Sequence, residues 1–364
     1  MKVANVVGAR PNFMKIAPIL QAMRQDSFFT PILIHTGQHY DAAMSDVFFR
    51  ELELPIPDVN LSVGSGSHGK QTGEVMVRFE EVISADRPDL VLVVGDVNST
   101  LAAALVAAKM HIKVAHVEAG LRSFDRSMPE EINRILTDAI SDFLFVTERS
   151  AEHNLAAEGV KAEKVFFVGN VMIDALMANR KRAAASDVLK RFRLEENAYA
   201  VLTLHRPSNV DAAEPLERIV AALEVIRDKA PIVFPAHPRT LKNLQRFGLL
   251  ERLERGGKVR VVEPLGYVDF LRLTDASRMV ITDSGGLQEE TTMLGVPCVT
   301  LRENTERPVT VEQGTSTLVG NDTAKILAAA ENGLASGRMT ARIPELWDGQ
   351  AAERIAAVLK KHFS

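Results

Sequence analysis

Short apolar runs rich in β-branched residues alternate with amphipathic stretches along the whole sequence, and this alternation constrains the fold more than any other feature. Most runs are nearly continuous apolar segments, which is typical of strands buried on both faces of a parallel sheet. The predicted strands are Val3–Gly8, Pro31–Gly37, Leu90–Asp96, Val114–Ala119, Phe143–Glu148, Val165–Asn170, Ala198–His205, Ile232–His237, Val259–Pro264, Met279–Asp283 and Val299–Arg302. Among the predicted helices, Glu214–Ile226 places apolar residues at Leu216, Ile219, Val220, Leu223 and Ile226. Strand and helix in this repeating order predict an α/β chain with doubly wound parallel sheets.

The length of the chain, 364 residues, is that of about two domains at roughly 150 residues each. The segment Ala175–Asn197 is charged, favours helix and contains no strand pattern. We interpret it as a helical connection between two sheets, which places a domain boundary near residue 170.

Composition and charge exclude several classes of protein. Hydrophobic residues make up 46% of the chain and charged residues 25%, which excludes a disordered or collagen-like chain. The net charge of −4 argues against a nucleic-acid-binding surface. Cys298 is the single cysteine, so the chain has neither an internal disulfide nor a cysteine-based zinc site. The N-terminal apolar stretch is too short for a signal peptide or a membrane span, so we expect a soluble cytoplasmic protein that does not bind membranes.

The residues that follow each predicted strand carry most of the functional information, because parallel sheets bind ligands beyond the carboxyl ends of their strands. Seven of these ends carry a charged or imidazole side chain, and most of them also carry glycine. They are Gly8-Ala9-Arg10, Gly37-Gln38-His39, Gly95-Asp96, Glu118-Ala119-Gly120, His205-Arg206, His237-Pro238-Arg239 and Asp283-Ser284-Gly285-Gly286. One such end is commonly a turn with a solvated charge, but their repetition predicts a ligand cleft between two facing sheets.

The segment Asp283–Glu290 joins a predicted strand to a predicted helix. Gly285 and Gly286 let backbone N–H groups approach a ligand, the helix dipole favours an anion, and the Ser284 hydroxyl adds a donor. The alternative is plain helix capping by Ser284. Two consecutive glycines exceed what a cap requires, so the sequence favours phosphate binding. Glu290 is within reach of a sugar hydroxyl, although its spacing alone favours a solvated carboxylate.

The segment Met128–Arg134 begins another predicted helix. Pro129 suits the first turn, and Glu130 and Glu131 suit the positive end of the helix dipole. Taken alone, this pattern indicates dipole compensation. The apolar residues at helical spacing predict the buried face of the helix, made by Ile132, Ile135, Leu136, Ala139 and Ile140.

Asp96 and Glu118 lie at the ends of hydrophobic strands. A buried carboxylate at such a position is costly unless it is paired, hydrogen-bonded or functional. Several carboxylates near one cleft can exchange protons with a ligand. His205 and His237 can neutralise phosphate or relay protons, although a single histidine at a strand end is more often a structural group.

Two motif matches are rejected. Gly64–Gly69 fits the dinucleotide-binding pattern G-x-G-x-x-G, but no clear strand precedes it, and a loop that orders over a ligand fits better. His116-Val117-Glu118 resembles the start of a zinc-deaminase motif whose cysteine pair is absent. The sequence therefore predicts neither a metal site nor a cofactor.

Taken together, the motifs are similar to those of a known family. They are Gly8-Ala9-Arg10-Pro11 with Lys15, Thr36-Gly37-Gln38-His39, Gly95-Asp96, His116–Arg122, Pro129–Arg134, Leu204-His205-Arg206, Thr282–Glu290 and Thr305–Pro308. In this order, over nearly the full length, they resemble the non-hydrolysing UDP-N-acetylglucosamine 2-epimerases. The resemblance implies a GT-B fold, with two Rossmann-like domains and the nucleotide sugar in an interdomain cleft. It also implies that the C-terminal helix returns to the first domain, so the expected domains are residues 1–169 with 347–364, and residues 170–346.

The family inverts C2 of UDP-N-acetylglucosamine (UDP-GlcNAc) to give UDP-N-acetylmannosamine (UDP-ManNAc). No carbonyl group lies next to C2, so its proton is not acidic enough for direct removal. The family instead eliminates UDP to form a glycal and then adds UDP back, with a proton delivered to the opposite face of C2. By resemblance, Asp96, Glu118 and Glu130 are the catalytic carboxylates, and His205 is the essential histidine near the phosphates.

The resemblance also implies the binding residues. Contacts to the substrate are expected from Arg10, Lys15, Ser284, Gly285, Gly286, Glu290 and Arg307, with Leu265 and Phe270 beside the uracil. Glu290 is expected to hold the ribose, which overturns the solvated interpretation. Some members bind a second UDP-GlcNAc as an activator, and the similar positions here are Gln38, His39, Arg206 and His237. Members are commonly dimeric, so a homodimer is expected.

The sequence departs from the family pattern around the sugar. Asn12 replaces a glutamate common after Arg10, and Ser208-Asn209 stands where a glutamate often follows the His-Arg pair. The loop Arg122–Met128 also resembles relatives that act on UDP-2,3-diacetamido-2,3-dideoxyglucuronic acid, whereas Thr305–Pro308 favours the UDP-GlcNAc branch. These departures leave the C3 and C6 substituents of the sugar and the activator site open. The other hypotheses are a GT-B glycosyltransferase, a hydrolysing epimerase and a nucleotide-sugar sensor without turnover.

Overall fold

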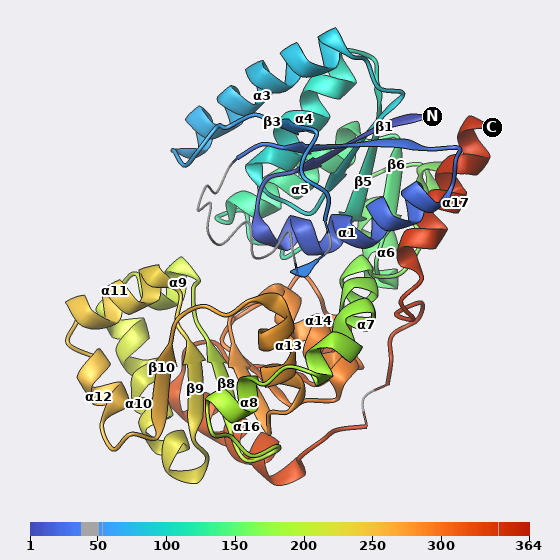
Figure 1. Cartoon of the computed structure of the whole chain (residues 1–364). Coiled ribbons are helices and arrows are strands. Elements are labelled where there is room, and N and C mark those ends of the chain that lie inside the picture. The colour runs from blue at the N-terminus through green and yellow to red at the C-terminus, as the bar shows by residue number, and fades with distance from the viewer. Residues whose placement is uncertain (38–50, 53, 341) are drawn as a thin grey trace. The chain divides into compact units, whose positions relative to one another are not determined.

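The computed structural model describes residues 1–37, 51–52, 54–340 and 342–364. The chain forms two compact units (Figure 1): unit 1 comprises Met1–Ala178 and Glu345–Ser364, and unit 2 comprises Asn179–Pro344. The first division falls within helix α7 (Val171–Ala184), so the connection predicted from the charged segment is helical at its start. No helix within these described ranges is long and apolar enough to cross a membrane.

Unit 1 is built on sheet A, a seven-stranded sheet in the order β3-β2-β1-β4-β5-β6-β7. Every pairing is parallel. The strands are β1 (Lys2–Val7), β2 (Thr30–His35), β3 (Val59–Asn60), β4 (Leu90–Val94), β5 (Lys113–Ala119), β6 (Phe143–Val146) and β7 (Val165–Phe167). The strand order reverses between β1 and β4. In doubly wound sheets, ligands bind at the carboxyl ends of the strands on either side of such a reversal.

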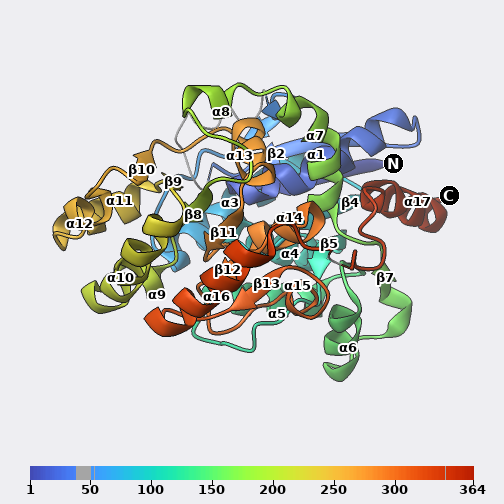
Figure 2. The ribbon, with the colours of Figure 1, turned by 90° about the horizontal axis from the view of Figure 1, so that it is seen from below.

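The helices of unit 1 cover sheet A. They are α1 (Arg10–Gln25), α3 (His68–Ala85), α4 (Asn98–Lys109), α5 (Pro129–Ile140), α6 (Arg149–Ala157), the 3₁₀ helix η1 (Ala162–Lys164), α7 and α17 (Ala351–Phe363). Helix α4 packs between α3 and α5. In the core beneath them, Phe79 of α3 lies in one apolar cluster with Val91 and Val93 of β4. Helices α1 and α17 pack against each other and lie side by side in both Figure 1 and Figure 2.

The C-terminal segment is fixed to unit 1 by specific bonds. Trp347 is 1% exposed, and its indole N–H donates to the Thr147 carbonyl at 3.1 Å. Asp174 accepts the backbone N–H groups of Ala351 and Ala352 at 3.2 and 2.7 Å, which caps the start of α17. These contacts explain why the final helix belongs to the first unit.

Unit 2 is built on sheet B, a six-stranded sheet in the order β10-β9-β8-β11-β12-β13, again with parallel pairings. The strands are β8 (Ala200–Thr203), β9 (Ile232–Pro235), β10 (Val259–Val262), β11 (Met279–Thr282), β12 (Cys298–Thr300) and β13 (Ser316–Leu318). The helices are α8 (Val188–Arg191), α9 (Pro207–Val210), α10 (Ala213–Lys229), α11 (Pro238–Arg246), α12 (Leu250–Glu254), α13 (Tyr267–Asp275), α14 (Gly285–Leu294), α15 (Val309–Glu312) and α16 (Thr323–Ser336). The order reverses between β8 and β11.

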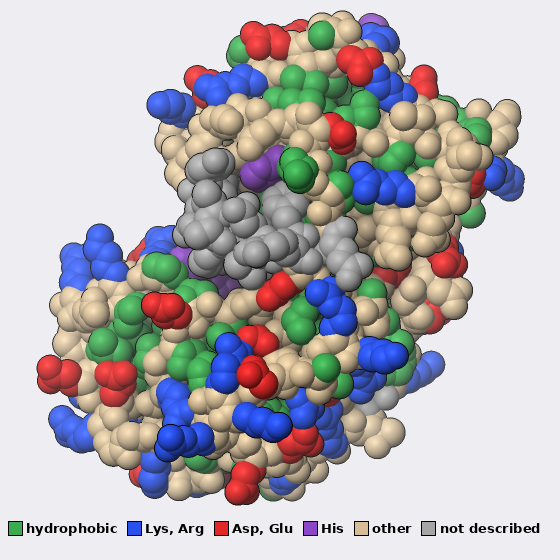
Figure 3. Space-filling model, viewed as in Figure 1, with side chains coloured by type: hydrophobic (Ala, Val, Ile, Leu, Met, Phe, Trp, Pro, Cys, Tyr) green, Lys and Arg blue, Asp and Glu red, His purple; other side chains and the backbone are tan. Residues whose placement is uncertain are grey.

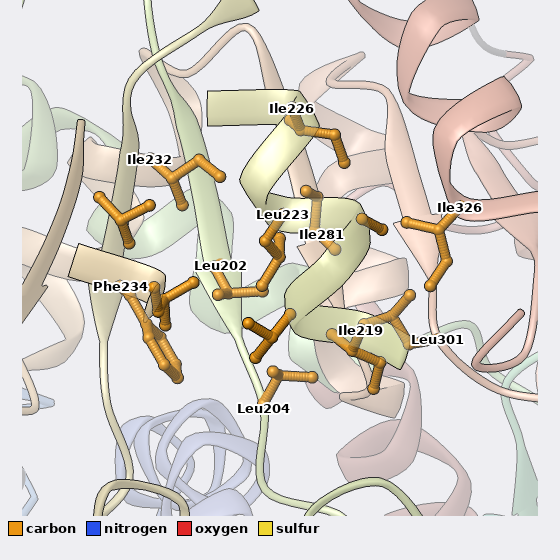
Figure 4. Close-up of a cluster of buried hydrophobic side chains, with 14 of the residues drawn as sticks. Leu202, Leu204, Ile219, Leu223, Ile226, Ile232, Phe234, Ile281, Leu301 and Ile326 are labelled. Atoms are coloured by element: carbon orange, nitrogen blue, oxygen red, sulfur yellow. The ribbon is translucent and has the colours of Figure 1, made fainter. Parts of the chain in front are cut away.

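The core of unit 2 lies between α10 and sheet B (Figure 4). Figure 4 shows Ile219, Leu223 and Ile226 of α10 facing side chains of β8, β9 and β11. All five apolar positions predicted for this helix are buried: Leu216, Ile219, Val220, Leu223 and Ile226. The prediction of an amphipathic helix on a buried parallel sheet is therefore confirmed here, and so is the α/β fold of two parallel sheets.

Candidate active site

The carboxyl end of β4 supplies Asp96 beside the strand-order reversal of sheet A. The preceding Gly95 has a φ of +67°, a left-handed conformation that favours glycine. Asp96 Oδ2 accepts hydrogen bonds from Arg134 Nε at 3.0 Å and Nη2 at 2.6 Å. Its carbonyl oxygen accepts one from Asn133 Nδ2 at 2.9 Å. The Asp96 side chain is 22% exposed, so it is fixed in position by α5 and still reachable from solvent.

Glu118 lies at a β-bulge near the end of β5, where the pairing with β6 shifts register between Val117 and Ala119. Its φ of +73° is uncommon for a residue with a side chain and costs on the order of 1–3 kcal/mol. Bulges next to active sites re-aim side chains. Here the Glu118 carboxylate forms an ion pair with the ammonium group of Lys15 from α1. The Lys15 and Glu118 side chains are only 7% and 4% exposed, so the pair lies largely out of water.

Asn12 joins this group from the start of α1. It is buried, and its Nδ2 donates to the Val94 carbonyl at 2.5 Å. The glutamate expected at this position could not donate that bond, because an ionised carboxylate only accepts. Asn12 Oδ1 has no hydrogen-bond partner among the described residues, although buried acceptors are normally satisfied. A ligand hydroxyl is one group that can satisfy it.

Helix α5 buries its polar side, so the predicted buried face is wrong at Ile132, Leu136 and Ala139. Ile135 and Ile140 are partly buried, and Ile140 packs against the core. Ile132 and Leu136 are 37% and 46% exposed, and Ala139 is also exposed. The buried residues are Glu131, Asn133, Arg134, Thr137 and Asp138. The physical reason lies in the loops after β4 and β5, which present charged and backbone polar groups to the helix. Burying them requires hydrogen-bond partners, and the polar side of α5 supplies these partners.

The two glutamates at the start of α5 have different surroundings. Glu131 is 1% exposed, and it accepts hydrogen bonds from Ser123 N, Ser123 Oγ and Phe124 N, each at 2.9 Å. Glu131 also pairs with Arg134 at 2.7 Å. Glu130 is partly exposed and forms no hydrogen bond or ion pair with the described residues. Glu131 therefore holds the loop after β5, and the Glu130 carboxylate remains available to a ligand.

At the carboxyl edge of sheet B, a buried aspartate holds His205. Asp283 Oδ1 lies 2.9 Å from His205 Nδ1, and Asp283 Oδ2 accepts the backbone N–H of Arg206 at 2.9 Å and Asn209 Nδ2 at 3.2 Å. Burial alone raises the pKa of Asp283, but the hydrogen bonds and the charge of His205 hold it below its usual value. The His205 side chain is 45% exposed. Asp283 therefore fixes the ring through Nδ1, while Nε2 has no hydrogen bond to a described residue. Asp283 lies within the predicted motif at the end of β11, but no role was predicted for it.

The start of α14 carries the predicted anion-binding residues. Ser284 occupies the N-cap position, but its side chain makes no capping hydrogen bond, so plain capping does not explain it. A Cβ on Gly285 would lie 2.7 Å from Arg307 Nη1 and 2.9 Å from Glu306 Oε1, so a side chain there would require the buried Arg307 and Glu306 side chains to shift. Gly286 follows in the first turn of the helix. The backbone N–H groups of this turn have no partners within the helix, as at any helix start.

Arg307 lies beneath the start of α14 and is 5% exposed. Its Nε donates to Glu289 Oε1 at 2.7 Å, and its Nη1 pairs with Glu306. Glu306 also pairs with Arg302 at 2.6 Å. These contacts use two of the three guanidinium nitrogens of Arg307 in an internal network that packs against Gly285.

Glu290 is buried, at 4% exposure, so the solvated interpretation taken from spacing alone is wrong. Its Oε1 accepts the hydroxyl hydrogen of Tyr267 at 3.1 Å. Burial, together with the charge of Glu289, raises the pKa of Glu290 to about 7, even though the Tyr267 hydrogen bond acts in the opposite direction. Tyr267 was not predicted. Its position at the start of α13, after the predicted strand end, was the only signal in the sequence.

The remaining predicted residues fall into three groups. Leu265 and Phe270 flank Tyr267 and are partly exposed. Arg206 Nε donates to the Asp283 carbonyl at 3.1 Å, and His237 accepts the Arg239 N–H at the start of α11. The ring centroids of His205 and His237 are 6.5 Å apart. Three predictions lie outside the described residues or atoms: Gln38, His39 and the side chain of Arg10.

The structure thus places Asp96 and Glu118 at the carboxyl edge of sheet A, with Lys15 paired to Glu118 and Glu130 at the start of α5. At the carboxyl edge of sheet B it places His205, Arg206 and Ser284, with Glu290 on α14 and Phe270 on α13. Among the described residues, no group of three or more His, Cys, Asp or Glu could hold a metal ion. On the face shown in Figure 3, acidic and basic side chains are interspersed over the described surface.

Comparison with known proteins gives one consistent result. Residues 21–360 match the family model described as UDP-N-acetylglucosamine 2-epimerase. The chain is 46% identical over 365 residues to the UDP-N-acetylglucosamine 2-epimerase of Methanocaldococcus jannaschii, with 99% of each chain covered. It is 43% identical over 365 residues to the UDP-2,3-diacetamido-2,3-dideoxy-D-glucuronate 2-epimerase of Pseudomonas aeruginosa, covering 99% of this chain and 100% of that protein. The crystal structure of the M. jannaschii enzyme in complex with UDP-GlcNAc and UDP matches with a TM-score of 0.93 at 45% identity, covering 99% of this chain and 100% of that one.

Proposed function

Because the chain belongs to the UDP-N-acetylglucosamine 2-epimerase family, we propose that it is an isomerase that interconverts UDP-GlcNAc and UDP-ManNAc. The observation that carries the proposal is the group of carboxylates at the edge of sheet A, with Glu118 held beside Lys15 and Asp96 beside Arg134. A glycosyltransferase needs an acceptor site, whereas inversion of C2 needs proton transfer on both faces of that carbon. Several carboxylates around one ligand suit the second task.

The proposed reaction has two steps, the elimination of UDP and its re-addition. In the first, a base removes the C2 proton, the electrons of the C–H bond form a C1–C2 double bond, and the C1–O bond breaks to release UDP as an anion. In the second, UDP adds back to C1 while an acid delivers a proton to the opposite face of C2. Asp96, Glu118 and Glu130 supply the acid and the base, and the ion pair with Lys15 holds the Glu118 carboxylate in position.

Unit 2 is proposed to hold the UDP part of the same substrate. The N–H groups of the first turn of α14, at Gly285 and Gly286, and the Ser284 hydroxyl suit the pyrophosphate. His205, oriented by Asp283, can donate from Nε2 to the leaving phosphate when it is protonated there. Supporting contacts are proposed from Glu290 to the ribose, from Leu265 and Phe270 to the uracil, from Arg10 to the phosphates, and from Arg307 to the base of α14.

A second UDP-GlcNAc is proposed to bind as an activator near Arg206 and His237, together with Gln38 and His39. Arg206 is the residue next to His205, so the charge of an anion bound to Arg206 would act electrostatically on the site of the leaving phosphate. The proposal predicts a sigmoidal dependence of rate on UDP-GlcNAc, which Arg206→Ala converts to a hyperbolic one. A hyperbolic dependence in the unmodified chain would remove the activator from the proposal.

The chain is also proposed to form a homodimer through the outer surface of α3, α4 and α5. Val77 of α3 is 59% exposed, and a Cβ on Gly73, one turn away, would meet no atom within 4 Å. In an antiparallel pairing of two α3 helices about residue 75, Val77 of each copy lies over Gly73 of the other. The same pairing brings Lys70 of each copy to Glu80 of the other, which is a self-complementary arrangement of charge. The exposed Ile132 and Leu136 extend this surface across α5.

The identity of the sugar separates two branches of the proposal. The P. aeruginosa relative is named for a substrate with acetamido groups at C2 and C3 and a carboxylate at C6. We favour UDP-GlcNAc because of the Thr305–Pro308 motif and the higher identity to the M. jannaschii protein. The cytoplasmic location expected from the sequence also stays a proposal.

The test is a panel of UDP-2-acetamido sugars incubated with the purified chain in heavy water and followed by proton NMR. The proposal predicts that UDP-GlcNAc and UDP-ManNAc interconvert without added cofactor or acceptor, with solvent deuterium at C2. Exchange only with the 2,3-diacetamido uronate would move the chain to the other branch. Absence of C2 deuterium from every sugar in the panel would reject the epimerase proposal.

A further inference from the structure

A buried cluster behind Asp96 and Glu118 has so far been given no role. His116 of β5 is fully buried, and Asp138 of α5 is 2% exposed. Arg122 pairs with Asp138 at 2.7 Å and with Glu158 at 2.7 Å. No member of this cluster is among the proposed catalytic or binding residues, so its charges require another explanation.

The hydrogen bonds of His116 define where its protons lie. Its Nε2 is 2.8 Å from the Gly95 carbonyl oxygen. A carbonyl oxygen only accepts, so Nε2 must carry a hydrogen. Its Nδ1 is 2.6 Å from Asp138 Oδ1. If Asp138 is ionised, Nδ1 must carry a hydrogen as well, and the ring is then an imidazolium cation.

The surroundings of Asp138 favour the ionised carboxylate. Its Oδ2 accepts the Gly120 N–H at 3.0 Å and is paired with Arg122 Nη2. Burial raises the pKa of Asp138, but the charges and hydrogen bonds of His116 and Arg122 outweigh it and leave the pKa below its usual value. The charged groups facing the ring and its partner are therefore Asp138 and Arg122, with Glu158 beyond Arg122. A neutral ring would leave Asp138 with less compensation in a buried site.

The same bonds reach the backbone on both sides of the proposed carboxylates. Gly95 immediately precedes Asp96. Its N–H donates to the Val117 carbonyl at 3.1 Å, and its carbonyl oxygen accepts the hydrogen bond from His116 Nε2. Gly120, bonded to Asp138, lies two residues after Glu118. Gly95, Glu118 and Gly120 all have left-handed φ angles, of +67°, +73° and +77°. Gly95 and Gly120 adopt this conformation at little cost because they have no side chain. Glu118 does have one, and its conformation persists only where surrounding contacts determine it.

We propose that His116 is a buried imidazolium that, together with Asp138, positions the Asp96 and Glu118 carboxylates by fixing the two strand ends that carry them. His116 touches neither substrate nor reacting atoms, so it is a positioning residue. The inference rests on the proposed epimerase function for its effect on rate, but the charge of the ring does not depend on that function.

The charge is tested by NMR of the whole chain with ¹⁵N-labelled histidine, which shows for each ring whether one or both nitrogens carry a hydrogen. The proposal predicts hydrogens on both nitrogens of the ring whose signals disappear in His116→Gln. A single ring hydrogen on His116 would overturn the imidazolium. The protonation state is read from the unmodified chain, and His116→Gln serves only to assign the ring.

The positioning role is tested by the kinetics of His116→Gln, in which the amide Nε2 can still donate to Gly95 but the cation and the bond to Asp138 are lost. We expect kcat to fall about 10- to 100-fold with KM changed less than about threefold, because small displacements of reacting groups act on rate. The matched control is Ser141→Ala, which removes a buried hydrogen bond to the Thr137 carbonyl at the far end of α5. Equal losses of kcat in the two variants, or a change confined to KM, would overturn the positioning role. An unmodified chain that lacks epimerase activity but shows the doubly protonated ring would reject the proposed function and leave the imidazolium standing.

Discussion

The carboxyl edges of sheet A and sheet B present different chemistry, although both sheets reverse their strand order in the same way. At sheet A, Glu118 and Asp96 are each paired with a cation, and Glu118 sits in a left-handed backbone conformation. At sheet B, the first turn of α14 offers N–H groups that have no partner within the helix, and the buried Glu290 accepts a hydrogen bond from the Tyr267 hydroxyl. Charged pairs hold carboxylates in defined positions for proton transfer, whereas a helix start suits an anionic ligand. The difference supports the proposal that unit 1 carries the chemistry and unit 2 carries the binding.

The largest effect is expected from neutralising the carboxylates of sheet A. Glu118→Gln, Asp96→Asn and Glu130→Gln should each lower kcat by roughly 10²-fold or more, the scale of a lost general acid or base. UDP affinity, measured by calorimetry, should stay within about threefold, because unit 2 is unchanged. Glu152→Gln, which alters a surface pair with Arg149, is the control. Full activity in all three carboxylate variants would remove the assignment of chemistry to sheet A.

At sheet B we expect a smaller effect, which falls on UDP affinity and not on kcat. Ser284→Ala should weaken UDP binding about tenfold, which is the lower end of the about 1.5–3 kcal/mol that one hydrogen bond to a charged group contributes. The value of kcat at saturating substrate should change little. Calorimetry and steady-state kinetics on the same preparation separate the two quantities. A fall in kcat with unchanged UDP affinity would contradict the proposal that the edge of sheet B binds UDP and takes no part in the chemistry.

Glu290 should make stability depend on pH in a direction opposite to that of an ordinary ion-paired carboxylate. Its pKa is about 7 in the folded chain and 4.5 in the reference state, so the folded chain binds the proton more tightly. The stabilisation is therefore complete below pH 4.5 and is lost as pH rises through 7. Denaturant unfolding should show the unmodified chain losing about 3 kcal/mol relative to Glu290→Gln across this range. Parallel pH profiles of the two proteins would show that Glu290 does not titrate as a buried acid.

The smallest effect on chemistry is expected from the outer surface of α5. Leu136→Glu places a charge on the proposed dimer surface, and sedimentation should show a shift from dimer to monomer. Leu136 does not face Asp96 or Glu118, so kcat per chain should stay within about threefold if the buried polar side of α5 is undisturbed. Val225→Glu, an equally exposed apolar position on α10 of unit 2, is the control. A monomeric unmodified chain would reject the dimer.

The fold was predictable because each strand or helix is marked by the pattern of apolar residues within its own segment of sequence. The apolar runs identify nearly every strand of both sheets, and α10 buries the residues that its pattern indicates. The strands missed, β3 (Val59–Asn60) and β13 (Ser316–Leu318), are two and three residues long, too short for a pattern. Helix α5 shows the limit of the method. Its amphipathic pattern is real, but the sequence does not say which side faces the protein when the neighbouring loops are polar.

The site was predictable in its residue types but not in its geometry. Glycine and carboxylates at strand ends marked Asp96 and Glu118, because a buried charge there needs a reason. The bulge at Glu118, the burial of Glu290 and the partner of His205 depend on contacts between distant segments. No spacing in the sequence encodes those contacts, so the roles of Asp283 and Tyr267 could not be predicted.

The most direct measurement asks whether the bond between C1 and the UDP oxygen breaks during turnover. UDP-GlcNAc labelled with ¹⁸O in the bridge between C1 and the β-phosphorus is incubated with the enzyme and followed by ³¹P NMR. If UDP leaves and adds back as proposed, the label moves from the bridge to the non-bridging oxygens of the β-phosphate as C2 inverts. Complete inversion of C2 with the label still in the bridge would show that UDP never leaves the sugar. The proposed assignment of chemistry to sheet A and UDP binding to sheet B would then have no chemical basis.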